Sequence, residues 1–220
     1  MCPRRSQWFK LIVLALALIL IVPILGACGG GKEGRLPSLK VGDNWTYELS
    51  DRGSYYSMTV EVIDQGKVNG IDCWVMQMSF DPNYMGVSTS TARYDKANLH
   101  ELQDQFSTTE SGVTASVSDI YSYDPSDYSN FPMEVGKQAT VTQTDTETDI
   151  IGGELTTDTT TTTLDWNIEA VERVTVTAGT FKCFKYTDGS STYWYSDKIK
   201  ADVKVVQEDG STMELKSYSV

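Results

Sequence analysis

Short runs rich in Thr, Tyr, Val and Ser, separated by Gly, Asn, Asp and Pro, fill the chain after residue 36. Apolar and polar residues alternate within these runs, a pattern typical of half-buried β-strands. Turn residues that tolerate a positive φ separate the runs, as at Asn69-Gly70 and Asp209-Gly210. The pattern predicts strands over residues 44–49, 55–65, 72–80, 87–94, 99–108, 113–122, 138–148, 156–174, 181–187, 191–195, 202–207 and 212–218. We therefore predict an all-β, antiparallel fold, a strongly curved sheet or open barrel, preceded by an N-terminal signal helix.

One segment of this β-rich region leaves two local structures open. Residues 95–98 resemble a turn, but Leu99 and Leu102 are spaced as on one face of a helix. A short helix over residues 96–105 is therefore the alternative to a turn at this place.

Two similar pentapeptides indicate that the single β-rich domain of residues 36–220 consists of two related halves. LKVGD at 39–43 recurs loosely as MEVGK at 133–137, and each is followed by a strand, a Gly turn and a strand with a cysteine before an aromatic residue. The alternative is that similar hairpins recur by chance in a Thr- and Val-rich protein. The candidate halves are residues 36–130 and 131–220.

The N-terminal segment has the composition of a secretory signal. Basic residues precede an almost wholly apolar run over 9–25, and small residues then precede a cysteine. The ending Leu25-Gly26-Ala27-Cys28 resembles the bacterial lipobox, and this resemblance implies removal of residues 1–27 and lipidation of Cys28. An uncleaved transmembrane anchor is the alternative, because about 17 apolar residues is the lower limit for a span. The Gly-rich residues 28–35 are expected to form a flexible tether.

The net charge limits the partners of the mature chain. Removal of the signal, which carries three basic residues and no acidic ones, leaves 15 Lys+Arg against 30 Asp+Glu, a formal charge of −15. Such a surface repels phosphate backbones, so we expect no nucleic-acid partner. It also repels anionic headgroups, so the lipid on Cys28 is expected to hold the protein to the cell membrane or outer membrane.

Two cysteines remain once Cys2 leaves with the signal and Cys28 carries lipid. They are Cys73 and Cys183, and an even pair in an exported protein is compatible with a disulfide. Strand alternation places both on the more polar face of their strands. A disulfide between them is one interpretation, and two separately buried thiols are the other.

Three segments carry a family resemblance. VGDNWTY at 41–47, VERVTVTAGTFKC at 171–183 and YWYS at 193–196 resemble the TapB-like envelope lipoproteins. The resemblance extends over most of residues 36–219. It implies an extracytoplasmic location and a β-sheet fold, and it supplies no catalytic residues.

Motifs for catalysis are missing from the sequence. The single histidine, His100, has no nucleophile or carboxylate at a recognisable spacing, and we predict a solvent-facing strand residue. Neither a phosphate-binding loop nor a Gly-x-Ser-x-Gly motif occurs. We therefore predict a protein that is not an enzyme and that needs no cofactor.

Acidic residues alternate at Asp145, Glu147 and Asp149, which places three carboxylates on one strand face. Oxygen ligands at that spacing could hold Ca²⁺. We favour a solvated acidic edge that discourages aggregation, and therefore no metal site. The Thr-rich residues 156–163 are expected to form a polar edge strand or a long hairpin.

Aromatic residues are the remaining candidates for a binding surface. Six of them are candidate ligand-facing residues: Trp45, Tyr47, Trp74, Tyr193, Trp194 and Tyr195. On a curved sheet they could line a cleft for a small apolar or carbohydrate ligand, although packing in a core is the alternative. The sequence thus predicts a non-enzymatic lipoprotein that binds a ligand or an envelope protein through its sheet. The alternative is a hydrolase of envelope polymers that uses paired carboxylates.

Overall fold

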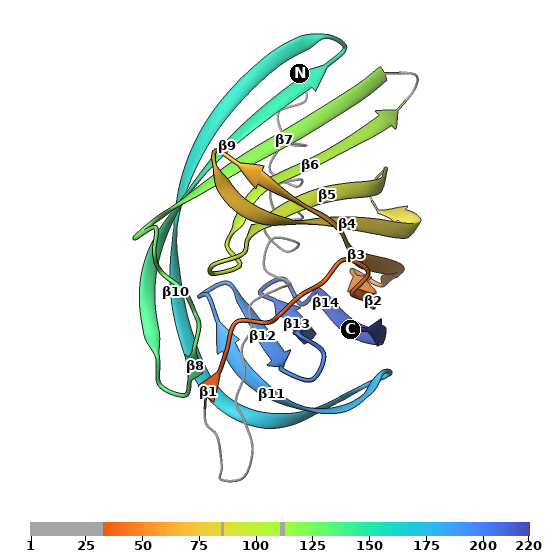
Figure 1. Ribbon diagram of the computed structural model, residues 1–220. Coiled ribbons are helices and arrows are strands. Elements are labelled where there is room, and N and C mark those ends of the chain that lie inside the picture. Colours follow the sequence, from red (N-terminus) through yellow and green to blue (C-terminus); the bar gives the residue numbers. More distant parts are fainter. Residues whose placement is uncertain (1–32, 85, 111–112) are drawn as a thin grey trace.

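The computed structural model is a closed antiparallel β-barrel, so the predicted all-β fold is confirmed (Figure 1). It describes residues 33–84, 86–110 and 113–220; the expected signal, Cys28 and most of the tether lie outside this range. The barrel strands are β2 (Asn44–Asp51), β3 (Ser54–Val68), β4 (Ile71–Tyr84), β5 (Val87–Asp95), β6 (Glu101–Glu110), β7 (Val113–Asp124), β9 (Gln138–Ile151), β10 (Glu154–Val176), β11 (Gly179–Thr187), β12 (Ser191–Ser196), β13 (Ala201–Gln207) and β14 (Thr212–Ser219). Two short strands, β1 (Glu33–Gly34) and β8 (Met133–Glu134), pair separately.

The barrel closes where the last strand meets the first. β14 pairs with β2, from Thr212 opposite Ser50 to Ser219 opposite Asn44. All other neighbours follow chain order, and β7 joins β9 across the short β8. Closure leaves no free edge in this sheet, which removes the usual route to edge-to-edge aggregation.

A turn, not a helix, connects β5 to β6. The backbone N–H of Leu99 donates to the carbonyl oxygen of Asp95 at 2.8 Å, and the Asp95 carboxylate accepts from the N–H of Ala97 at 2.8 Å. No helix long and apolar enough to cross a membrane occurs in the described residues.

The two pentapeptides of the proposed repeat form the same turn. The N–H of Gly42 donates to the carbonyl oxygen of Val62, and the N–H of Gly136 donates to that of Ile168, each at 2.8 Å. The two glycines have φ values of 93° and 92°, which only glycine adopts without strain. The pairing register shifts directly after Val62 in β3 and directly after Ile168 in β10. The two related halves stay a prediction, and we refer to β2–β7 and β9–β14 as the first and second series of six strands.

The apolar core fills one part of the barrel interior. Its largest fully buried side chains come mainly from β2, β3, β4, β11 and β12. Trp45 on β2 donates its indole N–H to the carbonyl oxygen of Ile199 at 2.6 Å. Tyr186 and Tyr193 stack with ring centroids 4.8 Å apart, and Trp166 stacks on Tyr186 at 5.8 Å. Burial of these aromatic rings supplies much of the stability of the fold.

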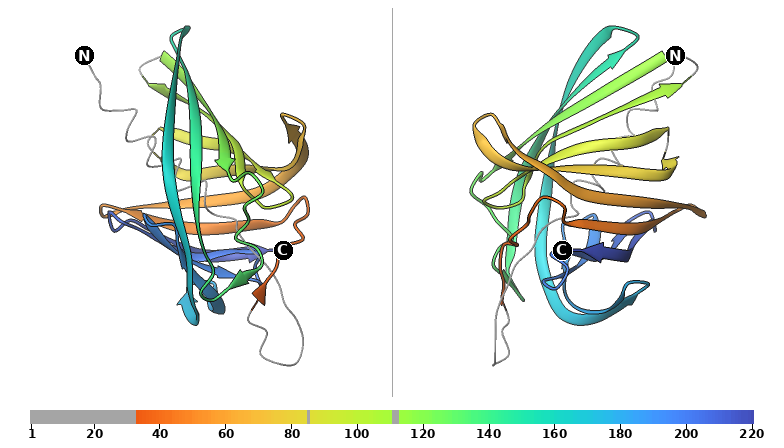
Figure 2. Two further views of the ribbon diagram at one scale, coloured as in Figure 1. Left: turned by 90° about the vertical axis from the view of Figure 1, so that its left-hand side faces the viewer. Right: turned by 45° about the vertical axis from the view of Figure 1, so that its right-hand side comes forward.

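The β9–β10 hairpin extends past the neighbouring hairpins (Figure 2). β10 is the longest strand, with 23 residues, and it pairs with β9 from Glu154 to Asn167. The Thr-rich segment therefore lies in a long hairpin, one of the two structures expected for it.

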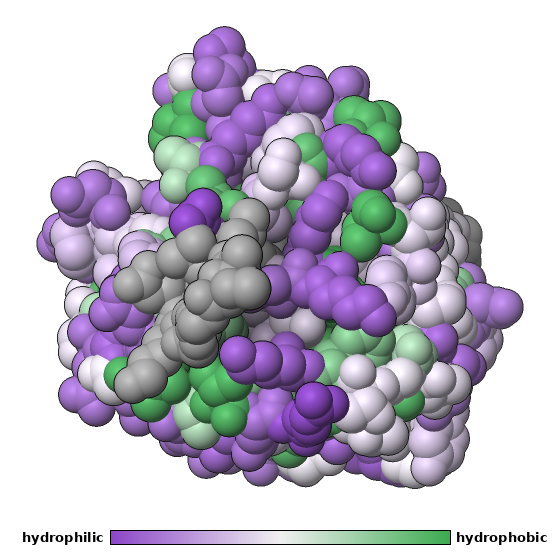
Figure 3. Space-filling view, turned by 60° about the horizontal axis from the view of Figure 1, so that its bottom comes forward, coloured by the Kyte–Doolittle hydropathy of each residue, from purple (hydrophilic) through white to green (hydrophobic). Residues whose placement is uncertain are grey.

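The outer surface is largely hydrophilic on the face shown in Figure 3, with scattered hydrophobic residues. The exposed hydrophobic residues include Val41 and Val135, which are 52% and 50% exposed and hold the same place in the two pentapeptides. Singly exposed residues of this kind are ordinary on a protein surface.

Candidate functional site

A row of carboxylates crosses three neighbouring strands on the inside of the barrel. Asp104 on β6 pairs with Asp119 on β7, and Asp119 pairs with Glu147 on β9. Asp119 is 2% exposed whereas the next residue, Ile120, is 42% exposed, so the strand turns Asp119 inward and Ile120 outward. Directly opposed residues have Cβ atoms about 4.5–5.5 Å apart. Pairing register thus brings together three acids that are distant in sequence.

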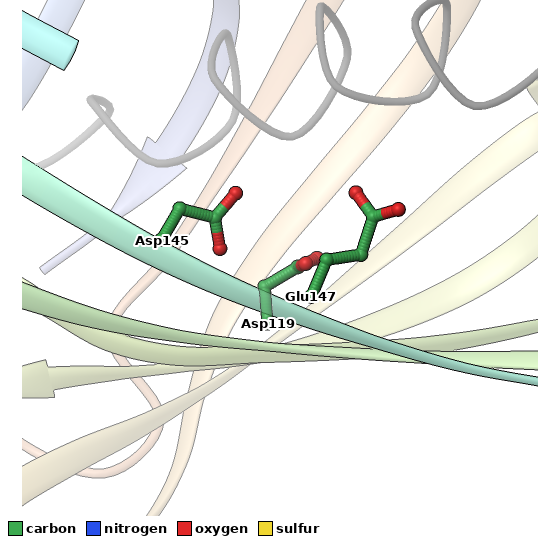
Figure 4. Close-up of side chains that lie close together, drawn as sticks. All are labelled: Asp119, Asp145 and Glu147. Carbon is green, nitrogen blue, oxygen red and sulfur yellow. The ribbon is translucent and has the colours of Figure 1, made fainter. Parts of the chain in front are cut away.

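Asp145 completes a compact group with two of these residues. It lies two positions before Glu147 on the same face of β9, opposite Tyr121. One carboxylate oxygen from each of Asp119, Asp145 and Glu147 lies within 4.8 Å of the others. Figure 4 shows the three side chains close together on one side of strands β7 and β9. We call Asp119, Asp145 and Glu147 the carboxylate triad.

Two more buried acids belong to the same inner wall. Glu101 and Asp104 are 2% and 1% exposed. One oxygen of Glu101 (Oε2), one of Asp104 (Oδ2) and one of Asp119 (Oδ1) have no hydrogen-bond partner in the described structure. A buried polar atom left without a partner costs about 1–3 kcal/mol, and more when the group is charged. The fold therefore maintains this wall at a considerable cost in stability.

Burial and mutual repulsion shift the protonation of these acids. Burial, followed by the charges of Asp145, Glu147 and Asp104, raises the pKa of Asp119 to about 8. Burial raises the pKa of Asp104 to about 7. Burial, with the charges of Asp104, Asp119 and Asp145, raises the pKa of Glu101 well above its usual range. Near neutral pH the wall therefore holds protons that a bound cation would displace.

Aromatic residues flank the acidic wall on the same strands. Tyr123 on β7 accepts a hydrogen bond from the side-chain amide of Gln143 at 3.0 Å. His100 packs against Tyr123 with ring centroids 4.3 Å apart, and it is only 8% exposed. The prediction of a solvent-facing histidine was wrong, because the turn after β5 places the ring beside Tyr123 and Tyr128. Burial lowers the pKa of His100 to about 4, so the ring is neutral at physiological pH.

The six candidate ligand-facing aromatic residues do not form one surface. Four of them are core residues with at most 1% exposed: Trp45, Tyr47, Tyr193 and Tyr195. Trp74 is half-buried, with the Lys96 ammonium 4.4 Å from its ring centroid. Trp194 is also half-buried, and its indole N–H donates to the Glu172 carboxylate. Four of the six candidate residues therefore pack in the core, which was the alternative to a ligand-facing surface.

The cysteines are separate in the structure, so the disulfide interpretation was wrong. Cys73 and Cys183 are free and fully buried. Cys73 lies on β4 and Cys183 on β11, with five strands between them in either direction around the barrel. A disulfide needs Cα atoms within about 7 Å. β4 and β11 each hold the third place in their series of six strands. The two cysteines therefore occupy equivalent places in the predicted repeat and lie on opposite sides of the barrel.

The acidic strand face was predicted as a solvated edge, and this was wrong. β9 is an interior strand that pairs with β7 and β10, and Glu147 is 9% exposed. Asp119 was missed because no local motif marks it. Only the register between β7 and β9 brings it to Asp145 and Glu147.

Comparisons with known proteins give structural neighbours but no family. No protein-family model and no curated protein matches the chain, so membership of the TapB-like family stays a prediction. A candidate lipoprotein of Parabacteroides distasonis has a TM-score of 0.40 and 15% identity, covering 82% of this chain and 96% of its own. A candidate exported protein of Bacteroides fragilis with a YmcC-like fold has a TM-score of 0.41 and 14% identity, covering 82% and 97%. The function proposed below is therefore argued from the residues of this chain.

Proposed function

We propose that this chain is a lipid-anchored lipoprotein of the cell envelope that binds a cationic ligand inside its barrel. The observation that carries the proposal is the buried acidic wall of β6, β7 and β9. Glu101, Asp104 and Asp119 each bury an oxygen that lacks a partner, and none of these three acids takes part in an ion pair among the described residues. A cation placed among them would neutralise charges that burial otherwise disfavours.

An apolar or carbohydrate ligand has less support. Four of the six candidate aromatic residues are in the core. A surface depression of about 420 Å³ over β5, β6, β7 and β9 is lined mainly by Ser and Thr side chains, whereas ligand sites for apolar molecules are lined mainly by apolar side chains. The chemistry of the acidic wall therefore favours a cation.

The lipid anchor rests on the sequence around Cys28. We expect intact-mass analysis of protein purified from its membrane to show loss of residues 1–27 and added acyl mass. Cys28→Ala is expected to leave the precursor uncleaved. Full-length protein without acyl mass would contradict the anchor.

The hydrolase alternative draws on the same wall, because Asp104 faces Asp119. Hydrolysis by a carboxylate pair needs one protonated acid and one ionised base or nucleophile, set by environments that push the two pKa values apart. Burial raises the pKa of both Asp104 and Asp119. Their environments therefore shift the two pKa values in the same direction and do not push them apart. We therefore propose binding without turnover.

The test uses the full chain in a nonionic detergent after treatment with a chelator. Binding of spermidine, Ca²⁺ and Mg²⁺ is measured by isothermal titration calorimetry at pH 8.5, together with the Asp104→Asn/Asp119→Asn double variant. We expect at least one cation to bind the wild type and to bind the double variant at least tenfold more weakly. Asp127→Asn is the control, since it removes an exposed carboxylate from the β7–β8 connection. Absence of binding by all three cations would refute the proposed function.

A further inference from the structure

We infer that Asp119, Asp145 and Glu147 form the binding site for one Ca²⁺ ion on the inner wall of the barrel. This inference rests on the proposed function, because it names the cation that the acidic wall binds. The site is built from two strands, with Asp119 supplied by β7 and the other two residues by β9.

The spacing of the oxygen atoms fits Ca²⁺. One oxygen from each residue lies within 4.8 Å of the other two. Ca²⁺ binds oxygen ligands at about 2.3–2.6 Å, so two ligands of one ion are at most about 4.6–5.2 Å apart. Mg²⁺ demands near-octahedral geometry and usually keeps several of its own waters, so a site made of protein carboxylates suits Ca²⁺ better.

The chemistry of the ligands points to the same class of ion. All three residues offer carboxylate oxygens, and no cysteine or histidine belongs to the group. Hard cations prefer oxygen ligands, whereas Zn²⁺ sites use mainly cysteine and histidine. The group is therefore better suited to Ca²⁺ than to a transition metal.

An independent observation beyond the acidic cluster also indicates a ligand. Asp104 lies directly opposite Asp119 in the pairing of β6 with β7, and it is only 1% exposed. Its Oδ2 atom has no hydrogen-bond partner, and neither has Oδ1 of Asp119. Buried polar atoms are nearly always satisfied in folded proteins. An ion beside Asp119 would give the orphaned oxygen of Asp119 a partner, and its positive charge would act on the neighbouring Asp104.

A buried carboxylate elsewhere in the barrel shows the contrast. Asp202 on β13 is 0% exposed, and both of its oxygens lie within hydrogen-bonding distance of the Tyr186 hydroxyl, at 3.2 and 3.1 Å. The apolar part of the barrel thus provides a donor for its buried acid. The described residues provide none for the orphaned oxygens of Asp104 and Asp119.

Tyr121 offers a direct optical test of the site. It lies opposite Asp145 in the pairing of β7 with β9, and directly opposed residues have Cβ atoms about 4.5–5.5 Å apart. Tb³⁺ substitutes for Ca²⁺ at oxygen sites and emits when a nearby tyrosine is excited. We expect chelator-treated full chain in a nonionic detergent to sensitise Tb³⁺ luminescence, and added Ca²⁺ to suppress the signal.

Variants assign the signal to the triad. We expect Asp119→Asn and Glu147→Gln each to weaken Ca²⁺ binding at least tenfold, as measured by calorimetry, while Asp127→Asn leaves it within twofold of wild type. Circular dichroism verifies that each variant retains the β-sheet spectrum.

The outcomes separate this inference from the proposed function. Ca²⁺ binding that is unaffected by Asp119→Asn and Glu147→Gln would overturn the assignment to the triad. Binding of spermidine without binding of Ca²⁺ would overturn the inference and leave the proposed function standing. Absence of binding by spermidine, Ca²⁺ and Mg²⁺ would overturn both.

Discussion

Replacing Asp119 by asparagine should make the ion-free protein less sensitive to alkaline pH. The folded state raises the pKa of Asp119 from its ordinary 3.8 to about 8, so near pH 6.5 the folded protein holds a proton that the unfolded chain has already released. Raising the pH therefore favours the unfolded chain until the folded carboxyl also ionises near pH 8. Asparagine has the same shape and carries no proton to lose.

The expected magnitude follows from the pH interval. One pKa unit corresponds to 1.36 kcal/mol, and about 1.5 units separate pH 6.5 from the pKa of Asp119 at about 8. Between pH 6.5 and pH 9 the wild type should therefore lose about 2 kcal/mol more of its unfolding free energy than Asp119→Asn. The charge of Asp119 also contributes to the raised pKa of Glu101. Its removal in Asp119→Asn therefore further reduces the pH dependence of the variant's stability. His100, whose pKa is about 4, stays neutral in the folded protein throughout this interval.

Urea unfolding of the full chain in a nonionic detergent, followed by circular dichroism, measures this difference. A chelator is present throughout, because Ca²⁺ would stabilise the ionised wild type and reduce the difference. Asp127→Asn is again the control, since it removes an exposed carboxylate. It should follow the wild type within about 0.5 kcal/mol, as expected for a surface substitution.

Equal pH dependence of the wild type and Asp119→Asn would refute the reasoning. That result would mean that Asp119 is solvated in the folded protein and that its oxygen is not an unsatisfied buried atom. A lower unfolding free energy of Asp119→Asn than of the wild type at pH 9 would also contradict the reasoning. It would mean that the ionised carboxylate stabilises the folded protein more than the amide does.

One pair of glycine substitutions and one thiol-labelling experiment check the fold. Gly42→Ala and Gly136→Ala should each destabilise the protein by about 1–2 kcal/mol, because their φ values of 93° and 92° are strained for any residue with a Cβ; a loss at only one of them would argue that the two turns are not equivalent. Thiol labelling of the unfolded, unreduced protein should find both Cys73 and Cys183 reactive, since both are free, and labelling of neither would restore the disulfide.

The strands could be predicted from the sequence because their signal is local. Each of the twelve predicted runs overlaps one of the twelve barrel strands, β2–β7 and β9–β14. Alternation of apolar and polar residues marks each strand, and Gly, Asn and Asp mark its ends. Closure of the barrel has no such signal, because it depends on β14 pairing with β2 across most of the chain.

The site could not be predicted for a related reason. Asp104, Asp119 and Glu147 become neighbours only through the register of β6 with β7 and of β7 with β9. A shift of one residue in either pairing would turn the acids of one strand to the other face. Spacing along the chain revealed Asp145 and Glu147, which share one strand, but gave no sign of Asp119. The prediction of ligand-facing aromatic residues was wrong for four of the six because their signal is local but ambiguous. Period-two alternation marks a face that packs in the core and a face that binds a ligand in the same way.

The two series of six strands differ at the place of β6 and β7, which carry part of the acidic wall. β6 and β7 hold the fifth and sixth places of the first series, and β13 and β14 hold the same places in the second. The second pair contributes Val203, Val205, Met213 and Leu215 to the core, and its one buried acid, Asp202, accepts from the Tyr186 hydroxyl. The first pair buries Asp104 and Asp119, and one oxygen of each has no hydrogen-bond partner among the described residues. At this place in the barrel the fold can therefore supply a donor to a buried acid, and it supplies none to the orphaned oxygens of Asp104 and Asp119. Residues that break the packing rule at a cost in stability are expected at functional positions. The contrast within one barrel thus favours binding as the reason why the acids are kept on β6 and β7.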